Sequence, residues 1–269
     1  GGGGDDPTPP EPEPEVPAPS AATLIYPDNN EACTEGGLVS QVFSFALPKD
    51  KKTGLKVTTI EQAKNAKKYH EGFAKLMKNT DPVKTGVFNQ TVKYQSAESK
   101  HKKTVIDRML LKVELVDPNL KMIEPFFQKL FGGKLYQSRV ARIENLLITA
   151  AGNKASLIRN VLDNIESGEN VSGLDDAFAK TREKLGDDAN FIFMINVPQS
   201  ILDGINFVSD IQPFGMLLGF LPIDRTAKAP KSFTGMSLKK VNNGLTGTLF
   251  VPTEQPKQIL KLLGPLINN

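Results

Sequence analysis

Ser237 and Lys240 have the spacing of an SxxK motif, in which a serine attacks an acyl group with the help of a nearby lysine. Two Lys-Thr-Gly tripeptides, at 52–54 and 84–86, are a second element of one class of serine acyl-enzymes. The context differs from that class, because Ser237 falls in a predicted strand, both tripeptides precede it and no Ser-Asp-Asn occurs. A serine acyl-enzyme that uses Ser237 and Lys240 is therefore the weaker of the functional alternatives.

Metal and cofactor chemistry have few candidate residues in this chain. The only histidines are His70 and His101, and the only cysteine is Cys33. His70 and Glu71 begin like an HExxH zinc motif, but Ala74 stands where the second histidine would be. No GxSxG, GxGxxG or P-loop pattern occurs either. We expect no metal, no cofactor and no catalytic apparatus, with His70 half-exposed on a helix.

Lysines give the chain two candidate surfaces for an anionic partner. Residues 1–48 contain eight acids and no Lys or Arg, so the rest of the chain carries all 33 basic residues and a net charge of +11. Such a body can attract an anionic polymer, a phosphate or a lipid surface. The alternative is an ordinary solvated lysine surface. The candidate residues are Lys64, Lys67, Lys68, Lys75 and Lys78 on a predicted helix, and Lys100, Lys102 and Lys103 in a predicted turn.

Nucleic acid is not an expected partner, because interleaved aromatic residues or a known motif would be needed and neither occurs. The absence of Trp weakens a glycan-binding interpretation too. An apolar stretch at 211–223 is a candidate contact loop for lipid or protein, with burial in the core as its alternative. It could also form the mouth of a cavity between sheet and helices in a carrier of lipid or another apolar ligand. The contact residues would be Phe214, Met216, Leu217, Leu218, Phe220 and Leu221.

The elements that would position these residues follow a recurring pattern of an apolar strand, a capping or proline turn and an amphipathic helix. Copies run over 54–77, 110–131, 146–165, 191–205 and 249–267. The predicted caps are a Thr59 and Gln62 capping box, Asp117 before Pro118, and Asn153.

Paired strands lie between these copies. Asn243-Gly244 is a strong hairpin signal, Glu144-Asn145 joins two further strands, and two more surround a basic turn at 98–103. Strand pairs followed by a helix predict an α+β fold with antiparallel or mixed sheets, helices packed on a face, and weakly repeated strand-strand-helix units. The body is one domain or two, and the best candidate for a subdivision is 168–172.

The N-terminal residues 1–21 predict a Gly/Pro/Glu-rich tether. Seven prolines between residues 7 and 19 favour extended polyproline II, a semi-rigid spacer of ~3.1 Å per residue. The alternative is a plain disordered terminus without an anchor. Residues 22–39 predict a short strand, at 22–26, and a turn, and the α+β body occupies 40–269.

The run of Gly, Asp and Pro at the start resembles the mature N-terminus of bacterial lipoproteins, and its early acidic residues resemble the surface-export signal of Bacteroidetes lipoproteins. That resemblance implies membrane attachment through a lipidated cysteine, which is not part of this chain. The segment APSAATLIYPDNNEACTEG resembles the first strand and turn of fibronectin type III-like modules of such proteins. It covers about twenty residues, and the tryptophan of the following strand is missing.

A second resemblance covers roughly residues 85–269. The runs LLITAAGNKASLIRNVLDNI, GLDDAFAKTREKL and NFIFMINVPQSIL, with the closing SLKKVNNGLTGTLFVPTEQPKQILKLLGPLI, resemble an uncharacterised domain family of bacterial extracytoplasmic proteins. The resemblance brings no catalytic residues. We therefore expect a non-catalytic binding or structural module at the outer membrane or cell surface, of unknown ligand, held off the membrane by a proline-rich stalk.

Overall fold

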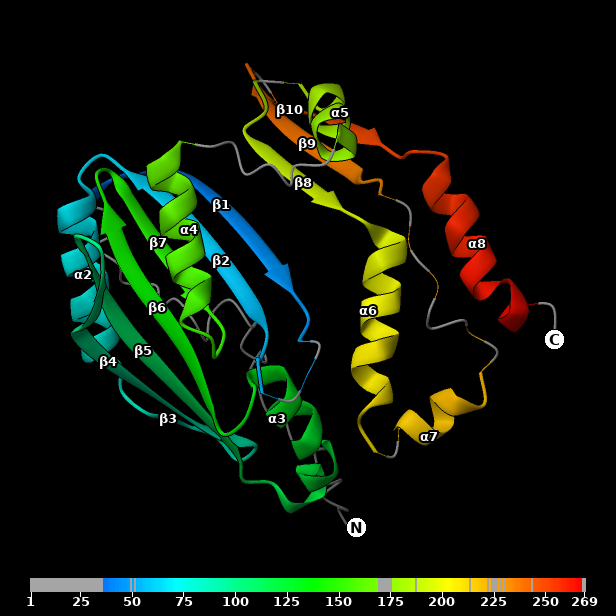
Figure 1. Cartoon of the computed structure of the whole chain (residues 1–269), viewed down its shortest axis with the longest axis horizontal. Coiled ribbons are helices and arrows are strands. Elements are labelled where there is room, and N and C mark those ends of the chain that lie inside the picture. Colours follow the sequence, from blue (N-terminus) through cyan, green and yellow to red (C-terminus); the bar gives the residue numbers. More distant parts are fainter. Residues whose placement is uncertain are drawn as a thin grey trace, which may run out of the picture.

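The computed structural model describes residues 36–48, 50, 52–168, 176–186, 188–212, 214–221, 223, 227, 229, 231–242 and 244–267. These residues form a seven-stranded sheet and a three-stranded sheet with helices around them, an α+β fold (Figure 1). The predicted tether and the predicted strand at 22–26 lie outside the described residues. The first strand begins at Leu38, two residues before the predicted start of the body.

Every pair of neighbouring strands in the larger sheet is antiparallel. The order of the strands in the sheet differs from their order along the chain, because β2 pairs with β7 rather than with β3. From one edge to the other the strands are β1 (Leu38–Ala46), β2 (Lys56–Ala63), β7 (Leu146–Ala151), β6 (Leu135–Ile143), β5 (Thr104–Leu115), β4 (Phe88–His101) and β3 (Val83–Lys84).

The smaller sheet, also antiparallel, has the order β10 (Gly244–Phe250), β9 (Thr234–Val241), β8 (Phe191–Ile195). The helices that accompany the first sheet are α2 (Ala66–Lys78), the 3₁₀ helix η1 (Pro118–Ile123), α3 (Glu124–Phe131) and α4 (Ser156–Ser167). Those of the second half are α5 (Asp176–Lys184), α6 (Val197–Ser209), α7 (Phe214–Gly219) and α8 (Glu254–Ile267).

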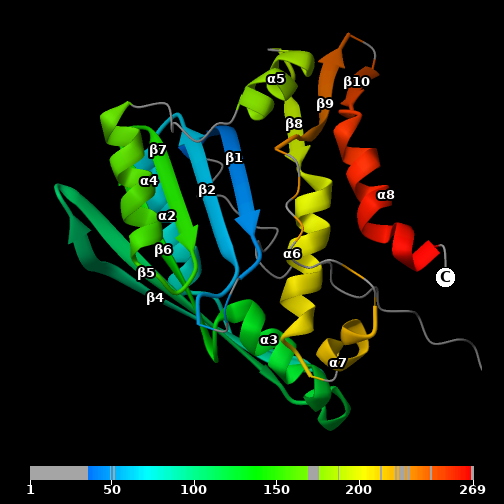
Figure 2. The same cartoon turned by 45° about the vertical axis from the view of Figure 1, so that its right-hand side comes forward.

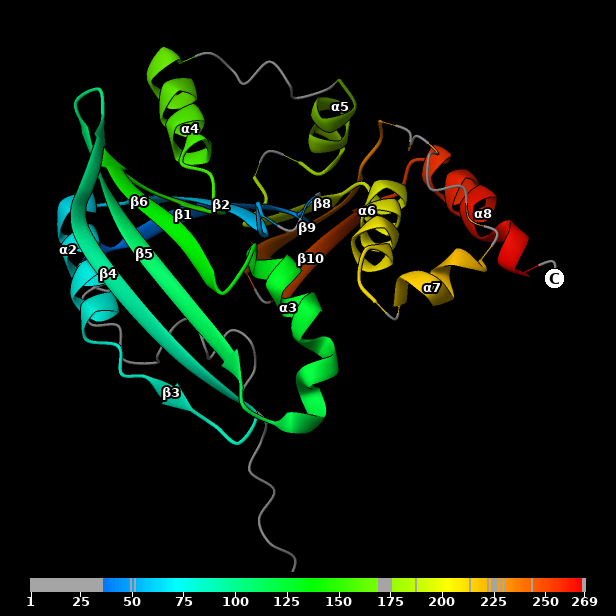
Figure 3. The same cartoon turned by 60° about the horizontal axis from the view of Figure 1, so that its bottom comes forward.

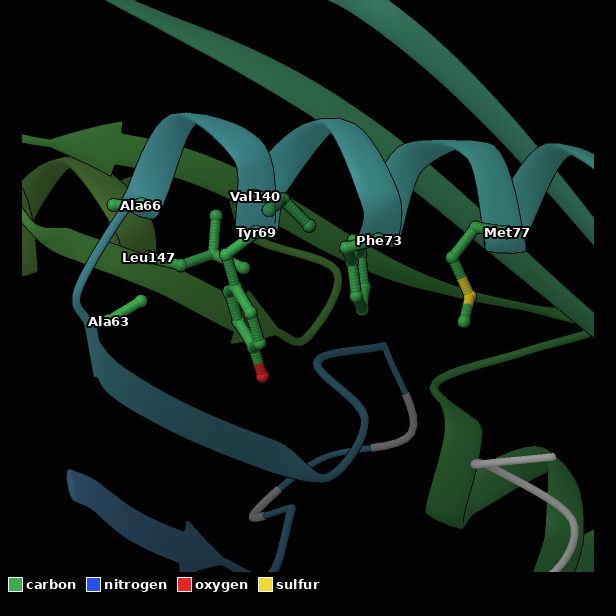
Figure 4. Packing of buried hydrophobic residues seen from close by; sticks show 7 residues of the cluster. All are labelled: Ala63, Ala66, Tyr69, Phe73, Met77, Val140 and Leu147. Carbon is green, nitrogen blue, oxygen red and sulfur yellow. The ribbon is translucent and has the colours of Figure 1, made fainter. Parts of the chain in front are cut away.

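Helix α2 packs on one face of the large sheet through a stripe at helical spacing. Tyr69, Phe73 and Met77 of α2 form one buried cluster with Val140 of β6 and Leu147 of β7 (Figure 4). Burying an aromatic or aliphatic side chain of this size contributes ~1.5–3 kcal/mol each. This cluster fixes the height of α2 over the sheet.

Helix α4 packs on the opposite face. Ala141 and Ile148, the neighbours of Val140 and Leu147 along their strands, join Ile158 and Leu162 of α4 in a second buried cluster. Successive strand residues point to opposite faces, so the central strands are apolar on both. Helices α2 and α4 accordingly lie on either side of the sheet (Figure 2). The predicted packing of helices on a face of the sheet is thus confirmed, and it occurs on both faces of this sheet.

The start of α2 corrects one predicted cap. Thr59 and Gln62 lie within β2, where their side chains point to opposite faces of the sheet. Asn65 caps the helix instead, and its side chain accepts a hydrogen bond from the amide of Lys68. Asp117 was predicted correctly as a cap, since its side chain accepts from the amide of Asn119 at the start of η1.

Asn153 does not cap α4 as predicted, because that helix begins at Ser156 without a side-chain cap. Its amide nitrogen instead donates to three carbonyl oxygens, those of Gly132 at 2.7 Å, Lys52 at 3.0 Å and Phe131 at 3.3 Å. Asn153 thus joins the loop before β2 to the C-terminus of α3.

The predicted strand pairs are confirmed in the structure. Strands β6 and β7 are joined by Glu144-Asn145, and β9 pairs with β10 up to Gly244. Strand β4 continues to His101, so the turn before β5 is shorter than the predicted 98–103. The register between β4 and β5 shifts between Gln95 and Ser99, which marks a β-bulge.

The two halves of the chain meet where α3 lies beside α6 (Figures 1 and 2). The rings of Phe126 and Phe207 pack edge to face with centroids 5.3 Å apart. Lys129, only 1% exposed, donates to the carbonyl of Phe207 at 2.6 Å and pairs with Asp210 at 3.0 Å. The strands of the first sheet all end by Ala151 and those of the second begin at Phe191, on either side of the predicted subdivision at 168–172.

Candidate functional site

The exposed side of α2 borders a pocket of about 440 Å³. Ala74, Lys75 and Lys78 line it from the helix, and Asn79 follows them. Ser96 of β4 and Asp107 of β5 come from the sheet, and His70 and Glu71 complete the lining. The pocket therefore lies where the C-terminal half of α2 crosses β4 and β5.

Asp107 is the centre of the polar network in the floor of this pocket. The residue is 4% exposed, and its carboxylate accepts hydrogen bonds from Nε2 of His70 at 2.9 Å and from the hydroxyl of Tyr94 at 2.5 Å. The backbone amide of Ala97 donates to its other oxygen at 2.7 Å. A buried carboxylate is stable only when such donors replace its water, so Asp107 fixes the orientation of the His70 ring.

The β-bulge supplies the third of these donors. Ala97 has a φ of +53°, in the left-handed region that residues with a side chain rarely adopt. This conformation turns its amide toward Asp107 and leaves the neighbouring Ser96 lining the pocket. Bulges of this kind often re-aim side chains next to binding sites.

Tyr94 connects the pocket floor to the core. Its ring packs edge to face on Phe73 at 6.1 Å, and Nζ of Lys78 lies 5.9 Å from its centroid. Burial first, and then the hydrogen bond to Asp107 and the charge of that residue, raise the pKa of Tyr94 far above its usual value. Tyr94 is therefore a neutral hydrogen-bond donor over the physiological pH range.

The five predicted helix lysines share the exposed side of α2 and the turn before it, a surface we call the lysine face: Lys64, Lys67, Lys68, Lys75 and Lys78. Lys67 lies 4.0 Å from Glu71. Within the described part of the chain, the other four have no carboxylate oxygen within 4.0 Å. The lysine face thus keeps most of its charge, and its last two members border the pocket.

The second predicted lysine group is separate from the first. Lys102 pairs with Asp163 at 2.6 Å and with Glu166 at 3.0 Å, both on α4, and His101 lies 2.9 Å from Asp163. Figure 3 shows the tip of the β4–β5 hairpin beside α4. Because α4 and α2 lie on opposite faces, the two groups do not form one surface, and the charge of Lys102 is compensated. Lys100 and Lys103 are exposed.

The predicted apolar loop includes the short helix α7. Phe220 is 81% exposed, and Met216, Leu217 and Leu221 are exposed as well, whereas Phe214 and Leu218 are half-buried. Gly215 packs tightly on the end of α6, since a Cβ there would lie 2.0 Å from the carbonyl oxygen of Ser209. Its role in contact with lipid or protein stays a prediction.

Ser237 and Lys240 do not come together. Ser237 is buried and its hydroxyl donates to the carbonyl of Leu185 at 2.7 Å, while Lys240 lies three residues further along β9 and so on its other face. The α2 pocket instead contains Ser96 together with His70 and Asp107. No hydrogen bond joins Ser96 to His70 among the described residues.

Metal ligands do not gather in the described part of the chain, where no group of three or more His, Cys, Asp or Glu side chains is placed to hold an ion. His70 and His101 bind different carboxylates, on opposite sides of the large sheet. No helix among the described residues is long and apolar enough to span a membrane.

Sequence reasoning identified Lys75, Lys78 and a half-exposed His70, but missed Asp107 and Tyr94. One signal was available, because Asp107 lies between the apolar residues Ile106 and Met109–Leu111 in a strand. A buried acid in such a strand needs hydrogen-bond donors, yet the side chains that donate to Asp107 are 13 and 37 residues away along the chain.

No protein-family model, curated protein or solved structure matches the chain.

Proposed function

We propose that this chain is a non-catalytic binding module whose lysine face receives an acidic surface of a macromolecular partner. The observation that carries the proposal is the position of Lys75 and Lys78. Both belong to a helix face whose cations mostly lack carboxylate partners among the described residues, and both border the α2 pocket. An acidic side chain entering the pocket would meet two ammonium groups at the rim.

The pocket floor adds directionality to this charge attraction. Because Nε2 of His70 faces Asp107 and Tyr94, its Nδ1 is the ring nitrogen left for a ligand. Asn79 and Ser96 offer further hydrogen-bonding groups in the same pocket. Rim charges of this kind mainly raise the association rate and set its salt dependence, whereas the polar floor selects the group that fits.

The cellular location belongs to the same proposal. The proline-rich composition of residues 1–21 and the lipoprotein-like start favour an extracytoplasmic module on a spacer, attached through a lipidated cysteine before this chain. Radiolabelled palmitate incorporated into the protein in its native cell would support the anchor, and a soluble unlabelled product would contradict it.

Charge reversal on the lysine face tests the binding site. Poly-L-glutamate serves as the acidic probe, with its affinity measured by biolayer interferometry over a series of salt concentrations. Lys75→Glu combined with Lys78→Glu should weaken binding about tenfold or more, equivalent to about 1.4 kcal/mol. The matched control is Lys180→Glu with Lys184→Glu, which changes the net charge equally on the exposed surface of α5.

An equal loss in the control pair would show that only net charge matters and would contradict the site. A serine-reactive fluorophosphonate tests the enzyme alternative separately. We expect no labelling of the wild-type chain. Labelling that Ser96→Ala or Ser237→Ala removes would contradict the non-catalytic proposal.

A further inference from the structure

Two arginines stand directly opposite each other on the face of the large sheet that α4 covers. Arg108 of β5 and Arg139 of β6 are cross-strand partners. Each lies two residues from a member of the cluster under α4, Ile106 and Ala141, so both side chains point to that face. Like charges in directly opposed positions destabilise an antiparallel pair.

Arg139 is the more buried of the two, and one nitrogen of its guanidinium has no hydrogen-bond partner in the described part of the chain. The residue is 9% exposed, and its Nη1 atom has no hydrogen bond among the described residues. Nε of Arg108 is likewise buried without a partner. The remaining donors of Arg108 reach Gln137 at 2.9 Å and Glu98 at 3.6 Å.

The charges around Arg139 are mostly of its own sign. Burial lowers the pKa of Arg139, Glu98 opposes this effect, and Arg108 and Arg159 of α4 lower the pKa further. The three arginines and Glu98 leave this cluster with a net charge of +2. Buried charged donors without acceptors cost free energy that a bound anion would recover.

We propose that Arg108, Arg139 and Arg159 form a binding site for a phosphate-type oxyanion between α4 and strands β5 and β6. A phosphate group carries about −1.5 to −2 charges at neutral pH and several acceptor oxygens, which matches the charge of the cluster and its orphaned donors. Guanidinium groups bind such oxygens in a bidentate manner. The site lies on the opposite face of the sheet from the α2 pocket and is independent of the proposed function.

Thermal unfolding of the full chain in sodium phosphate and in sodium chloride of equal ionic strength tests the site. Phosphate should raise Tm by several degrees more than chloride, because only the folded state binds it. Arg139→Met should abolish this phosphate-specific shift while raising Tm in chloride, since it removes an unpaired buried charge. Arg159 is exposed, so Arg159→Gln should fold normally and reduce the shift.

The matched control is Arg142→Met, an exposed arginine on the opposite face of β6, which should keep the full shift. Lys75→Glu with Lys78→Glu should keep it too, because those residues belong to the other site.

Vesicles of phosphatidylglycerol distinguish the source of the anion. A shift with free phosphate identifies a soluble ligand, and vesicle binding without such a shift, lost in Arg159→Gln, identifies a lipid headgroup. Equal Tm in phosphate and chloride without vesicle binding, or effects that survive both arginine variants, would overturn the proposal.

Discussion

Asp107 accepts three hydrogen bonds, one from His70 of α2 and two from β4, where Tyr94 and the bulge residue Ala97 are the donors. One buried carboxylate therefore couples the rotamer of His70 to that of Tyr94. The polar floor of the α2 pocket is set before any ligand arrives, which lowers the ordering cost of binding.

Alkaline unfolding should report on the buried tyrosines. The pKa values of Tyr94 and Tyr136 are raised in the folded state, so their contribution is present below the ordinary tyrosine pKa of about 10 and is lost as the pH rises above it. Each should lower the free energy of unfolding by at most about 1.4 kcal/mol per pH unit, which is the limit for the release of one proton. Urea unfolding between pH 9 and 12 measures this slope.

Tyr94→Phe should reduce the dependence of the free energy of unfolding on pH above 9. The contribution of Tyr136 to that dependence should remain. Tyr136→Phe should have a similar effect, together with loss of the hydrogen bond to the carbonyl of Leu55. A slope unchanged in both variants would mean that neither hydroxyl is protected by folding.

The sequence predicted one helix cap correctly and two incorrectly, and the reason is physical. Asp117 was identified as a cap because Pro118 follows it, and proline is favoured at the first position of a helix. Thr59 and Gln62 also have capping spacing, but the alternation of their strand against β7 determines their conformation. The role of Asn153 depends on carbonyls at Lys52 and Gly132, which only the tertiary structure brings together.

At the scale of elements, ion pairs and hydrogen bonds attach the tip of the β4–β5 hairpin to α4. His101 and Lys102 meet Asp163 and Glu166 across more than sixty residues of chain. The sequence could predict the hairpin from its alternation, but it could not predict that acids of a distant helix would compensate this turn.

Replacing Lys102 should change how stability depends on pH. Its hydrogen bond, with that of His101, lowers the pKa of Asp163, so this contribution exists above the ordinary aspartate pKa and disappears as the pH falls through the lowered value. The raised pKa of Lys102 gives the mirror behaviour at high pH. Lys102→Met should therefore reduce stability at neutral pH and weaken its fall in acid, as measured by urea unfolding from pH 2 to 7.

Lys103 gives the matched control for this experiment. It stands in the same turn and is exposed, and it has no ion pair among the described residues. Lys103→Met should leave the pH profile unchanged, and an identical response of both variants would mean that general charge, and not the pairing with α4, stabilises the hairpin.

At the scale of the whole molecule, the chain divides into two sheets with a small shared contact. Between the halves, Phe126 and Lys129 of α3 contact Phe207 of α6 and Asp210, which directly follows that helix. Whether the predicted subdivision at 168–172 separates two domains stays a prediction. The residues of the contact were not predictable, because a buried lysine has no local sequence signature.

A fragment of residues 36–168 should fold alone. It contains the whole large sheet and both helix-to-sheet clusters. Its circular dichroism should show a cooperative thermal transition, with Tm lowered by a few degrees because Lys129 and Phe126 lose their cover. A fragment without cooperative unfolding would show that the second half is part of the same folding unit.

The position of β7 beside β2 has a consequence for synthesis. The β1–β2 hairpin is synthesised early, but β7, the other partner of β2, ends at Ala151. The edge of β2 that pairs with β7 therefore stays unpaired while some ninety further residues are synthesised. Strands β3 to β6 can pair in sequence during that interval, because each pairs with the next strand along the chain. Closure of the sheet thus depends on one long-range pairing of high contact order, which should limit the folding rate. Until then, one edge of β2 in the nascent chain has backbone hydrogen-bonding groups without a partner strand.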